Sequence, residues 1–154
     1  MKLALFDLDD TLLDGDSDWH WAQYLIGRGV LDRGEYERRN AEFHGRYSSG
    51  TLDIHEYLEF QLAPIAGRSR EELDEWHRGF MAERLRAIIH PKTPSLLAAH
   101  ADALVAIVTA TNRFVTGPIA AELGVPHLIA SEPEELPDGR FTGRETGTPC
   151  YREG

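Results

Sequence analysis

Apolar residues form short runs near the start of the chain and in its last third, and recur at helical spacing between them. The runs over residues 3–6, 103–109 and 127–130 have the length and composition of buried β-strands. A helical pattern follows the second run and ends near Gly124. Strands that alternate with helices predict an α/β fold with a parallel sheet and right-handed crossovers.

The stretch from residue 14 to residue 90 carries helical patterns only. Residues that favour helix N-caps open four of these patterns, and they are Asp16 or Ser17, Asp32, Asp53 and Ser69. Aromatic and aliphatic residues recur at helical spacing after each cap. We therefore expect a small helical bundle, residues 14–90, inserted into an α/β core of residues 1–13 and 91–154.

The first apolar run leads directly into an acidic segment. Asp7, Asp9 and Asp10 lie within four residues, and Thr11 follows. No Lys or Arg adjoins them, and an ionised carboxylate beside an apolar core must be paired, hydrogen-bonded or bound to metal. Mg²⁺ is the natural candidate because it binds oxygen ligands. The carboxyl edge of a parallel sheet is also where active sites lie.

This arrangement predicts a carboxylate nucleophile with an acid–base partner. Asp7 would form a covalent acyl-phosphate, and Asp9 would protonate the leaving group and then activate water. The hydroxyl of Thr11 can fix the loop. The alternative is a strand followed by an Asp-rich turn, since Asp favours turns.

Several further residues have two interpretations each. Thr111 and Asn112 can donate hydrogen bonds to a phosphate or substrate, or cap the next helix. Asp16 can reach an amine or hydroxyl of a substrate, or cap a helix. Arg46 and Arg113 can bind a substrate carboxylate or phosphate, or serve as solvated structural charges.

Several segments together resemble the haloacid dehalogenase superfamily, whose members are mostly phosphatases. Residues 3–11 resemble its first motif, and residues 103–109, an apolar run that ends at the Thr109 hydroxyl, resemble its second. The branch of phosphoserine- and histidinol-phosphatase-like hydrolases is the best match for four further segments, residues 110–115, 118–124, 128–131 and 138–143.

The resemblance implies a Rossmann-like core with an inserted helical cap and the activity of a Mg²⁺-dependent phosphomonoester hydrolase. It implies that Asp7 and Asp9 hold Mg²⁺, Asp9 through its main-chain carbonyl, and that Thr109 hydrogen-bonds the transferring phosphoryl group. The dehalogenases of the superfamily lack the second Asp, so the Asp-x-Asp pattern favours phosphoryl transfer. The implied substrate is a small phosphorylated metabolite.

Two features of the superfamily have no counterpart in these 154 residues. The third motif is a Lys and the fourth is an acidic pair that completes the metal site, whereas Lys2 and Lys92 are the only lysines. We therefore expect a member that is truncated at its C-terminus, with an incomplete core. The alternative is a non-catalytic fragment or pseudoenzyme, because losing a charge clamp on a phosphoryl group costs orders of magnitude in rate.

Charge and composition narrow the classes of partner. The formal net charge of −10 argues against nucleic acid, which requires clusters of Lys and Arg, and against an anionic membrane surface. Apolar runs stay far below the roughly 20 residues of a membrane span, and the N-terminus lacks the pattern of a signal peptide. Cys150 is the only cysteine, which excludes an intrachain disulfide and is typical of the cytoplasm. The histidines show no zinc-binding spacing.

Overall fold

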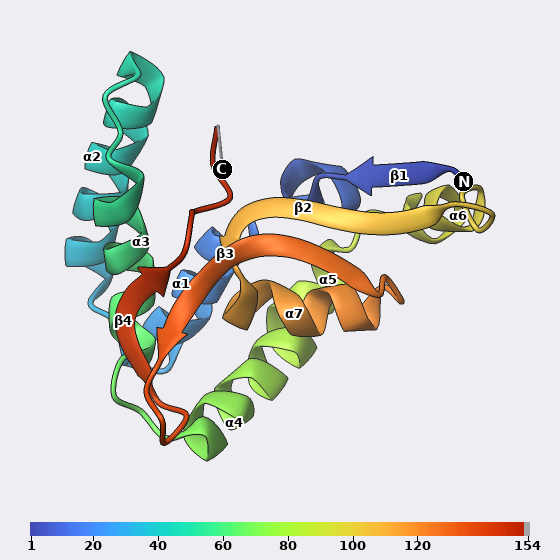
Figure 1. The fold of residues 1–154 in the computed structure, drawn as a ribbon. Helices are drawn as coiled ribbons and strands as arrows, with labels where there is room; N and C mark the ends of the chain where they lie inside the picture. Colours follow the sequence, from blue (N-terminus) through green and yellow to red (C-terminus); the bar gives the residue numbers. More distant parts are fainter. Residues whose placement is uncertain (153–154) are drawn as a thin grey trace.

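The structure is a computed structural model that describes residues 1–152. Four strands and seven numbered helices follow one another along the chain (Figure 1). The strands are β1 (Leu3–Phe6), β2 (Leu104–Asn112), β3 (His127–Glu135) and β4 (Phe141–Thr146). The helices are α1 (Ser17–Gly27), α2 (Arg33–Ser49), α3 (Ile54–Leu62), α4 (Arg70–Phe80), α5 (Arg86–Ile88), α6 (Thr93–Ala98) and α7 (Arg113–Glu122). Among the described residues, no helix is long and apolar enough to cross a membrane.

The strands form one sheet in the order β1-β2-β3-β4. The first three strands are parallel, with Phe6 opposite Ile107 and Ala106 opposite His127, while β4 runs antiparallel to β3. The predicted α/β class with a parallel core is therefore confirmed, and the antiparallel hairpin adds a strand to it. The carboxyl ends of β1 and β2 lie side by side, so the acidic segment meets the residues that follow Val108.

Two strands extend beyond their predicted ends. The predicted runs stop at residues 109 and 130, but β2 continues to Asn112 and β3 to Glu135. The added residues are mostly polar, and β3 uses them to pair with β4 through a hairpin whose turn contains Gly139. Polar residues in an extended strand carry no apolar pattern, which explains the difference.

The predicted helix starts agree with the observed caps. The side chains of Asp16, Asp32, Asp53 and Ser69 each accept a hydrogen bond from a backbone N–H in the first turn of α1, α2, α3 and α4. Asp16 rather than Ser17 caps α1. Each cap satisfies a donor that the helix itself leaves unpaired.

One hydrophobic cluster joins the sheet to the inserted helices. The Trp21 ring of α1 lies edge-on to Phe80 of α4 at 5.3 Å and to Phe114 of α7 at 5.6 Å. His77 donates from Nε2 to the Val115 carbonyl at 2.9 Å and ties α4 to α7. The division into an α/β core and a helical cap remains a prediction, because α1 and α4 share their buried face with α7.

Helix α2 contributes no residue to this cluster, whereas α3 joins it through the buried Leu62 and lies beside β4 (Figure 1). Their contact is aromatic, with Tyr36 stacked on Phe60 at 5.6 Å and Phe43 against Tyr57 at 5.3 Å. The Arg39 guanidinium lies over Phe43 and Phe60. Helix α2 is thus held against the main core through its aromatic contact with α3.

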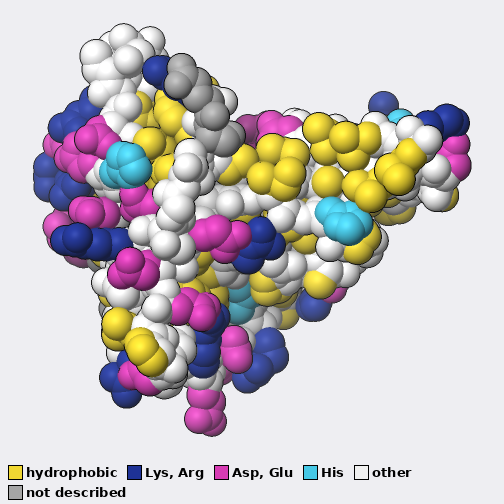
Figure 2. All heavy atoms as spheres, in the orientation of Figure 1, with side chains coloured by type: hydrophobic (Ala, Val, Ile, Leu, Met, Phe, Trp, Pro, Cys, Tyr) yellow, Lys and Arg dark blue, Asp and Glu magenta, His cyan; other side chains and the backbone are white. Residues whose placement is uncertain are grey.

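One face of the sheet exposes aliphatic side chains. Leu3, Leu5 and Ile129 are 62%, 56% and 52% exposed. Figure 2 shows hydrophobic side chains gathered over β1 and β2 on this face. This surface contrasts with the opposite face of the sheet, which α7 covers.

Gly79 provides a test of the packing between α1 and α4. The added Cβ of Gly79→Ala would lie 2.0 Å from the hydroxyl oxygen of Tyr24, a buried side chain. Overpacking costs about 1–3 kcal/mol, and the better helix propensity of Ala returns about 1 kcal/mol. We expect urea denaturation to show a free energy of unfolding that is lower than in the unmodified protein by up to about 2 kcal/mol.

Gly45→Ala is the matched control, because Gly45 lies inside α2. The added Cβ would have no side chain and no other segment of the chain within 4 Å. It should raise the free energy of unfolding by about 0.5–1 kcal/mol. Equal effects at the two glycines would contradict the close contact between Tyr24 and α4.

Candidate active site

The acidic segment lies at the carboxyl edge of the sheet. Asp7 follows β1, is exposed, and accepts a hydrogen bond from the backbone N–H of Leu8 at 2.8 Å. Asp10 takes a left-handed backbone conformation with φ 56°, which Asp tolerates better than most residues. The turn directs the chain from the end of β1 toward the first turn of α1, where Ser17 lies.

Asp9 is held between α1 and the end of β2. Its Oδ1 accepts from the backbone N–H of Ser17 at 2.7 Å, and its Oδ2 accepts from the Thr111 hydroxyl at 3.0 Å. The backbone N–H of Thr111 donates to the Thr109 hydroxyl oxygen at 3.2 Å. The predicted residues Asp9, Thr109 and Thr111 therefore belong to one hydrogen-bond network.

Asp18 is a second carboxylate in this network. Its Oδ2 lies 3.3 Å from the Thr111 hydroxyl, and its Oδ1 is buried without a partner among the described residues. The single hydroxyl hydrogen of Thr111 serves either Asp9 or Asp18 at one time. Asp18 was not predicted as a site residue from the sequence. An acidic residue in the first turn of a helix is usually exposed to solvent and favoured there by the helix dipole.

The clustered acids disfavour ionisation. Burial, and then the negative charge of Asp16, raise the pKa of Asp9 to about 6. Burial, followed by the charges of Asp16 and Asp9, also raises the pKa of Asp18 well above the 3.8 of an ordinary Asp side chain. A carboxyl group with a pKa near 6 can exchange protons with reactants near neutral pH.

The residues with two interpretations occupy structural positions. Asn112 accepts from the backbone N–H of Val115 at 3.2 Å and caps α7, while Asp16 caps α1. A role in substrate binding for Asp16, Thr111 and Asn112 remains a prediction.

The two arginines with two interpretations form ion pairs. Arg46 pairs with Glu56, and Arg113 binds Glu132 together with the Leu128 carbonyl.

The donors present at the sheet edge suit a hard divalent cation. Asp7 offers an exposed carboxylate, and the segment contains oxygen donors only. Mg²⁺ commonly takes one or two carboxylates together with water and substrate phosphate, so Asp7 and the Asp9 carbonyl fit such a site. Within residues 1–152, no three His, Cys, Asp or Glu side chains converge on one point.

Comparison with known proteins identifies the family. The haloacid dehalogenase-like hydrolase family matches residues 4–154. The chain belongs to this family. The predicted membership of the haloacid dehalogenase superfamily, among its phosphatases, is therefore confirmed. The predicted Rossmann-like α/β fold class is confirmed as well.

Individual relatives of this haloacid dehalogenase-like protein come from several bacteria. It is 43% identical to the histidinol-phosphatase of Neisseria meningitidis serogroup C (strain 8013), over 99% of this chain and 70% of that protein. A Bordetella pertussis Tohama I protein of unknown function has a TM-score of 0.88 and 46% identity, over 99% of this chain and 69% of that one. A phosphoserine phosphatase, solved as a phospho-aspartyl intermediate analogue, shares the fold with a TM-score of 0.58 and 20% identity. That comparison covers 95% of this chain and 63% of the phosphatase.

The raised pKa of Asp9 makes stability depend on pH. Between the unfolded value of 3.8 and the folded value of about 6, the folded state binds more protons than the unfolded chain. The free energy of unfolding therefore falls as pH rises through this window, by up to about 3 kcal/mol from Asp9. Urea denaturation at several pH values between 4 and 7, without divalent cations, measures this fall.

Asp9→Asn is the control for this titration, because it keeps the shape of the side chain and removes the ionisation. Its stability should fall less than that of the unmodified protein between pH 4 and 6. Parallel pH dependences in the two proteins would show that the carboxyl of Asp9 does not titrate in this window.

Proposed function

We propose that this protein is a phosphomonoester hydrolase that acts through an aspartyl-phosphate on Asp7. The observation that carries the proposal is the pairing of an exposed carboxylate on Asp7 with a buried Asp9 whose pKa is about 6, at the carboxyl edge of the sheet. The two carboxyl groups differ in environment, which is the usual basis for dividing nucleophile and acid–base roles. The phosphatase names among the relatives support the same reaction class.

The first half of the reaction transfers the phosphoryl group to Asp7. A carboxylate oxygen of Asp7 attacks phosphorus, and the bond from phosphorus to the ester oxygen breaks. Asp9 gives its proton to the departing alkoxide, so the alcohol leaves neutral. Thr109 is suited to bind a phosphoryl oxygen, because its own oxygen accepts from Thr111 and its hydrogen stays available to donate.

The second half releases phosphate. Asp9, now ionised, takes a proton from water, and the water oxygen attacks phosphorus. The bond between phosphorus and Asp7 breaks, and both the Asp7 carboxylate and the protonated Asp9 are restored. Mg²⁺, held by Asp7 and the Asp9 carbonyl, would supply positive charge beside the phosphoryl oxygens.

The proposed substrate class is a small phosphorylated metabolite. The relative from Neisseria meningitidis is a histidinol-phosphatase, so an amino-alcohol phosphate is the first candidate. Asp16 lies close enough to Asp9 to raise its pKa. We infer that the exposed carboxylate of Asp16 can reach an amine of a substrate bound at Asp7.

The nucleophile is tested by Asp7→Asn in the protein expressed from its natural gene. With Mg²⁺ and p-nitrophenyl phosphate, we expect kcat to fall at least about a thousandfold, because a neutral amide cannot form the acyl-phosphate. Trapping of radiolabelled phosphate on the unmodified protein, and none on the variant, should accompany the loss.

Asp10→Asn is the matched control, with the same chemical change in the same segment. Asp10 is exposed and Asn also tolerates its left-handed backbone, so kcat should change little. Full activity in Asp7→Asn, or equal losses in the two variants, would contradict a nucleophilic role for Asp7.

A further inference from the structure

Two adjoining cavities lie beside the acidic network, between α1, α2 and α3. Their volumes are about 210 and 120 Å³, and both are lined by Asp16, Asn40, His44 and Tyr57. The larger cavity reaches Ala110, which directly follows Thr109. A group bound there is therefore continuous with the edge of the sheet that carries the proposed reaction.

Asp18 lines the smaller cavity with an unsatisfied oxygen. The residue is 7% exposed, its Oδ1 is buried without a hydrogen-bond partner, and its Oδ2 lies near the Thr111 hydroxyl. A buried carboxylate oxygen of this kind requires a donor or an opposite charge. A ligand with an ammonium or another N–H group would supply both.

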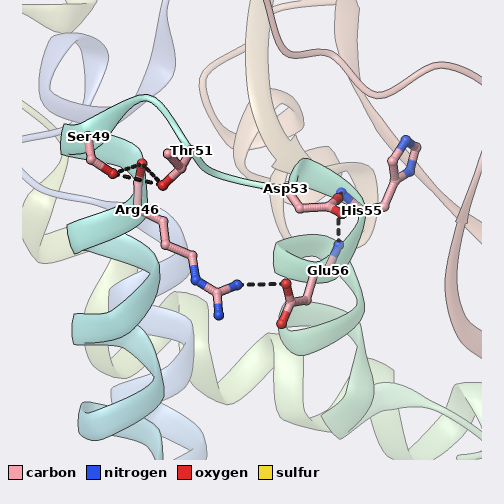
Figure 3. Close-up of polar contacts among 6 residues, drawn as sticks. All are labelled: Arg46, Ser49, Thr51, Asp53, His55 and Glu56. Carbon is pink, nitrogen blue, oxygen red and sulfur yellow. Dashed lines mark hydrogen bonds and ion pairs between the residues drawn. The ribbon is translucent and has the colours of Figure 1, made fainter.

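Lys and Arg side chains are directed away from these cavities, and His44 is the one basic side chain among the described residues that line them. No Lys or Arg lines either cavity among residues 1–152. Arg46 of α2 instead reaches across to Glu56 of α3 at 2.7 Å (Figure 3). Arg38 pairs with Glu42, and Arg39 stacks on Phe43 and Phe60. A carboxylate in the cavities would meet acids without a guanidinium to offset them.

Aromatic rings form the remaining walls. Phe43, Tyr47 and Tyr57 line the larger cavity, and Trp19 and Tyr36 line the smaller one. Such faces attract cationic nitrogen and planar rings. The cavities therefore combine Asp16 and Asp18 with aromatic surface and a single imidazole, that of His44, which favours a basic nitrogen group over a carboxylate.

We infer that these cavities bind the head group of the substrate and select phosphate esters that carry a basic nitrogen and no carboxylate. Asp18 is the specificity-determining residue of this site, with Asn40 on the facing helix α2. The inference rests on the proposed phosphomonoesterase function and adds to it a rule for choosing among phosphorylated amino alcohols.

The rule is tested with substrates that differ in the carboxylate alone. O-phosphoethanolamine and O-phospho-L-serine form such a pair. p-Nitrophenyl phosphate carries a nitro group but no basic nitrogen, so it measures phosphate-ester hydrolysis without the head-group contact. With Mg²⁺, the protein expressed from its natural gene should show kcat/KM at least about tenfold higher for O-phosphoethanolamine than for O-phospho-L-serine. Equal values, or a preference for O-phospho-L-serine, would overturn the inference.

Two variants connect the preference to the cavity. Asp18→Asn keeps an oxygen for Thr111 and removes the group that can ionise beside a cationic head group, so the ratio of kcat/KM for O-phosphoethanolamine to that for p-nitrophenyl phosphate should fall about tenfold. Asn40→Arg adds a cation and should raise the ratio of O-phospho-L-serine to O-phosphoethanolamine by a similar factor. Arg38→Gln, on an exposed ion pair of the same helix, should leave both ratios unchanged. Unchanged ratios in Asp18→Asn and Asn40→Arg would place the selection elsewhere.

A binding measurement separates this inference from the proposed reaction. Calorimetric titration requires no catalysis, and L-histidinol and L-histidine are suitable ligands. L-histidinol carries a hydroxymethyl group where L-histidine carries a carboxylate. Binding of L-histidinol at least about tenfold tighter, weakened in Asp18→Asn, supports the head-group site even if no ester is hydrolysed. Equal or undetectable binding of the two compounds overturns it, even if p-nitrophenyl phosphate is hydrolysed.

Discussion

The carboxylate of Asp9 is held by one N–H from the start of α1 and one hydroxyl from the end of β2. These two bonds connect α1 with the end of β2, segments that lie about a hundred residues apart in the chain, and they do so where the chain leaves β1. A buried carboxylate without a cation is unfavourable unless its oxygens are hydrogen-bonded. The contacts that position α1 relative to the sheet therefore also stabilise the ionised form of Asp9, against the burial and the charge of Asp16 that raise its pKa.

Features that depend on neighbouring residues, such as helix caps, could be predicted from the sequence. Contacts between residues far apart in the chain could not. Asp32, Asp53 and Ser69 cap the helices that they were expected to cap, because a cap depends on residues within one turn. The acidic segment after β1 was likewise recognisable as a candidate site. The burial of Asp18 was not visible, since it depends on α2 and on Thr111, which lie far away in the sequence.

The lengths of the strands show the same difference between features that depend on local sequence and features that depend on long-range contacts. The apolar parts of β2 and β3 were predicted, but the extension of β3 to Glu135 depends on pairing with β4. Its acids and proline indicate a loop when they are considered alone. The division into core and cap was predicted from the sequence order of strands and helices and remains a prediction, whereas the shared burial of Trp21, Phe80 and Phe114 is evident only from the packing.

The unequal attachment of the inserted helices has a mechanical consequence. Displacing α1 or α4 would expose the aromatic cluster around Trp21, at a cost of several kcal/mol. Helix α3 is anchored by Leu62, which is buried in the main cluster, and the ion pairs of His55 with Glu145 and of Arg144 with Glu59 add contacts with β4. Surface pairs of this kind contribute about 0–1 kcal/mol each. Helix α2 contributes no residue to that cluster and packs on α3 through Tyr36 and Phe43. Displacing α2 therefore breaks fewer buried contacts than displacing α1, α3 or α4, and we expect any opening of the cavities beside the acids to occur by movement of α2.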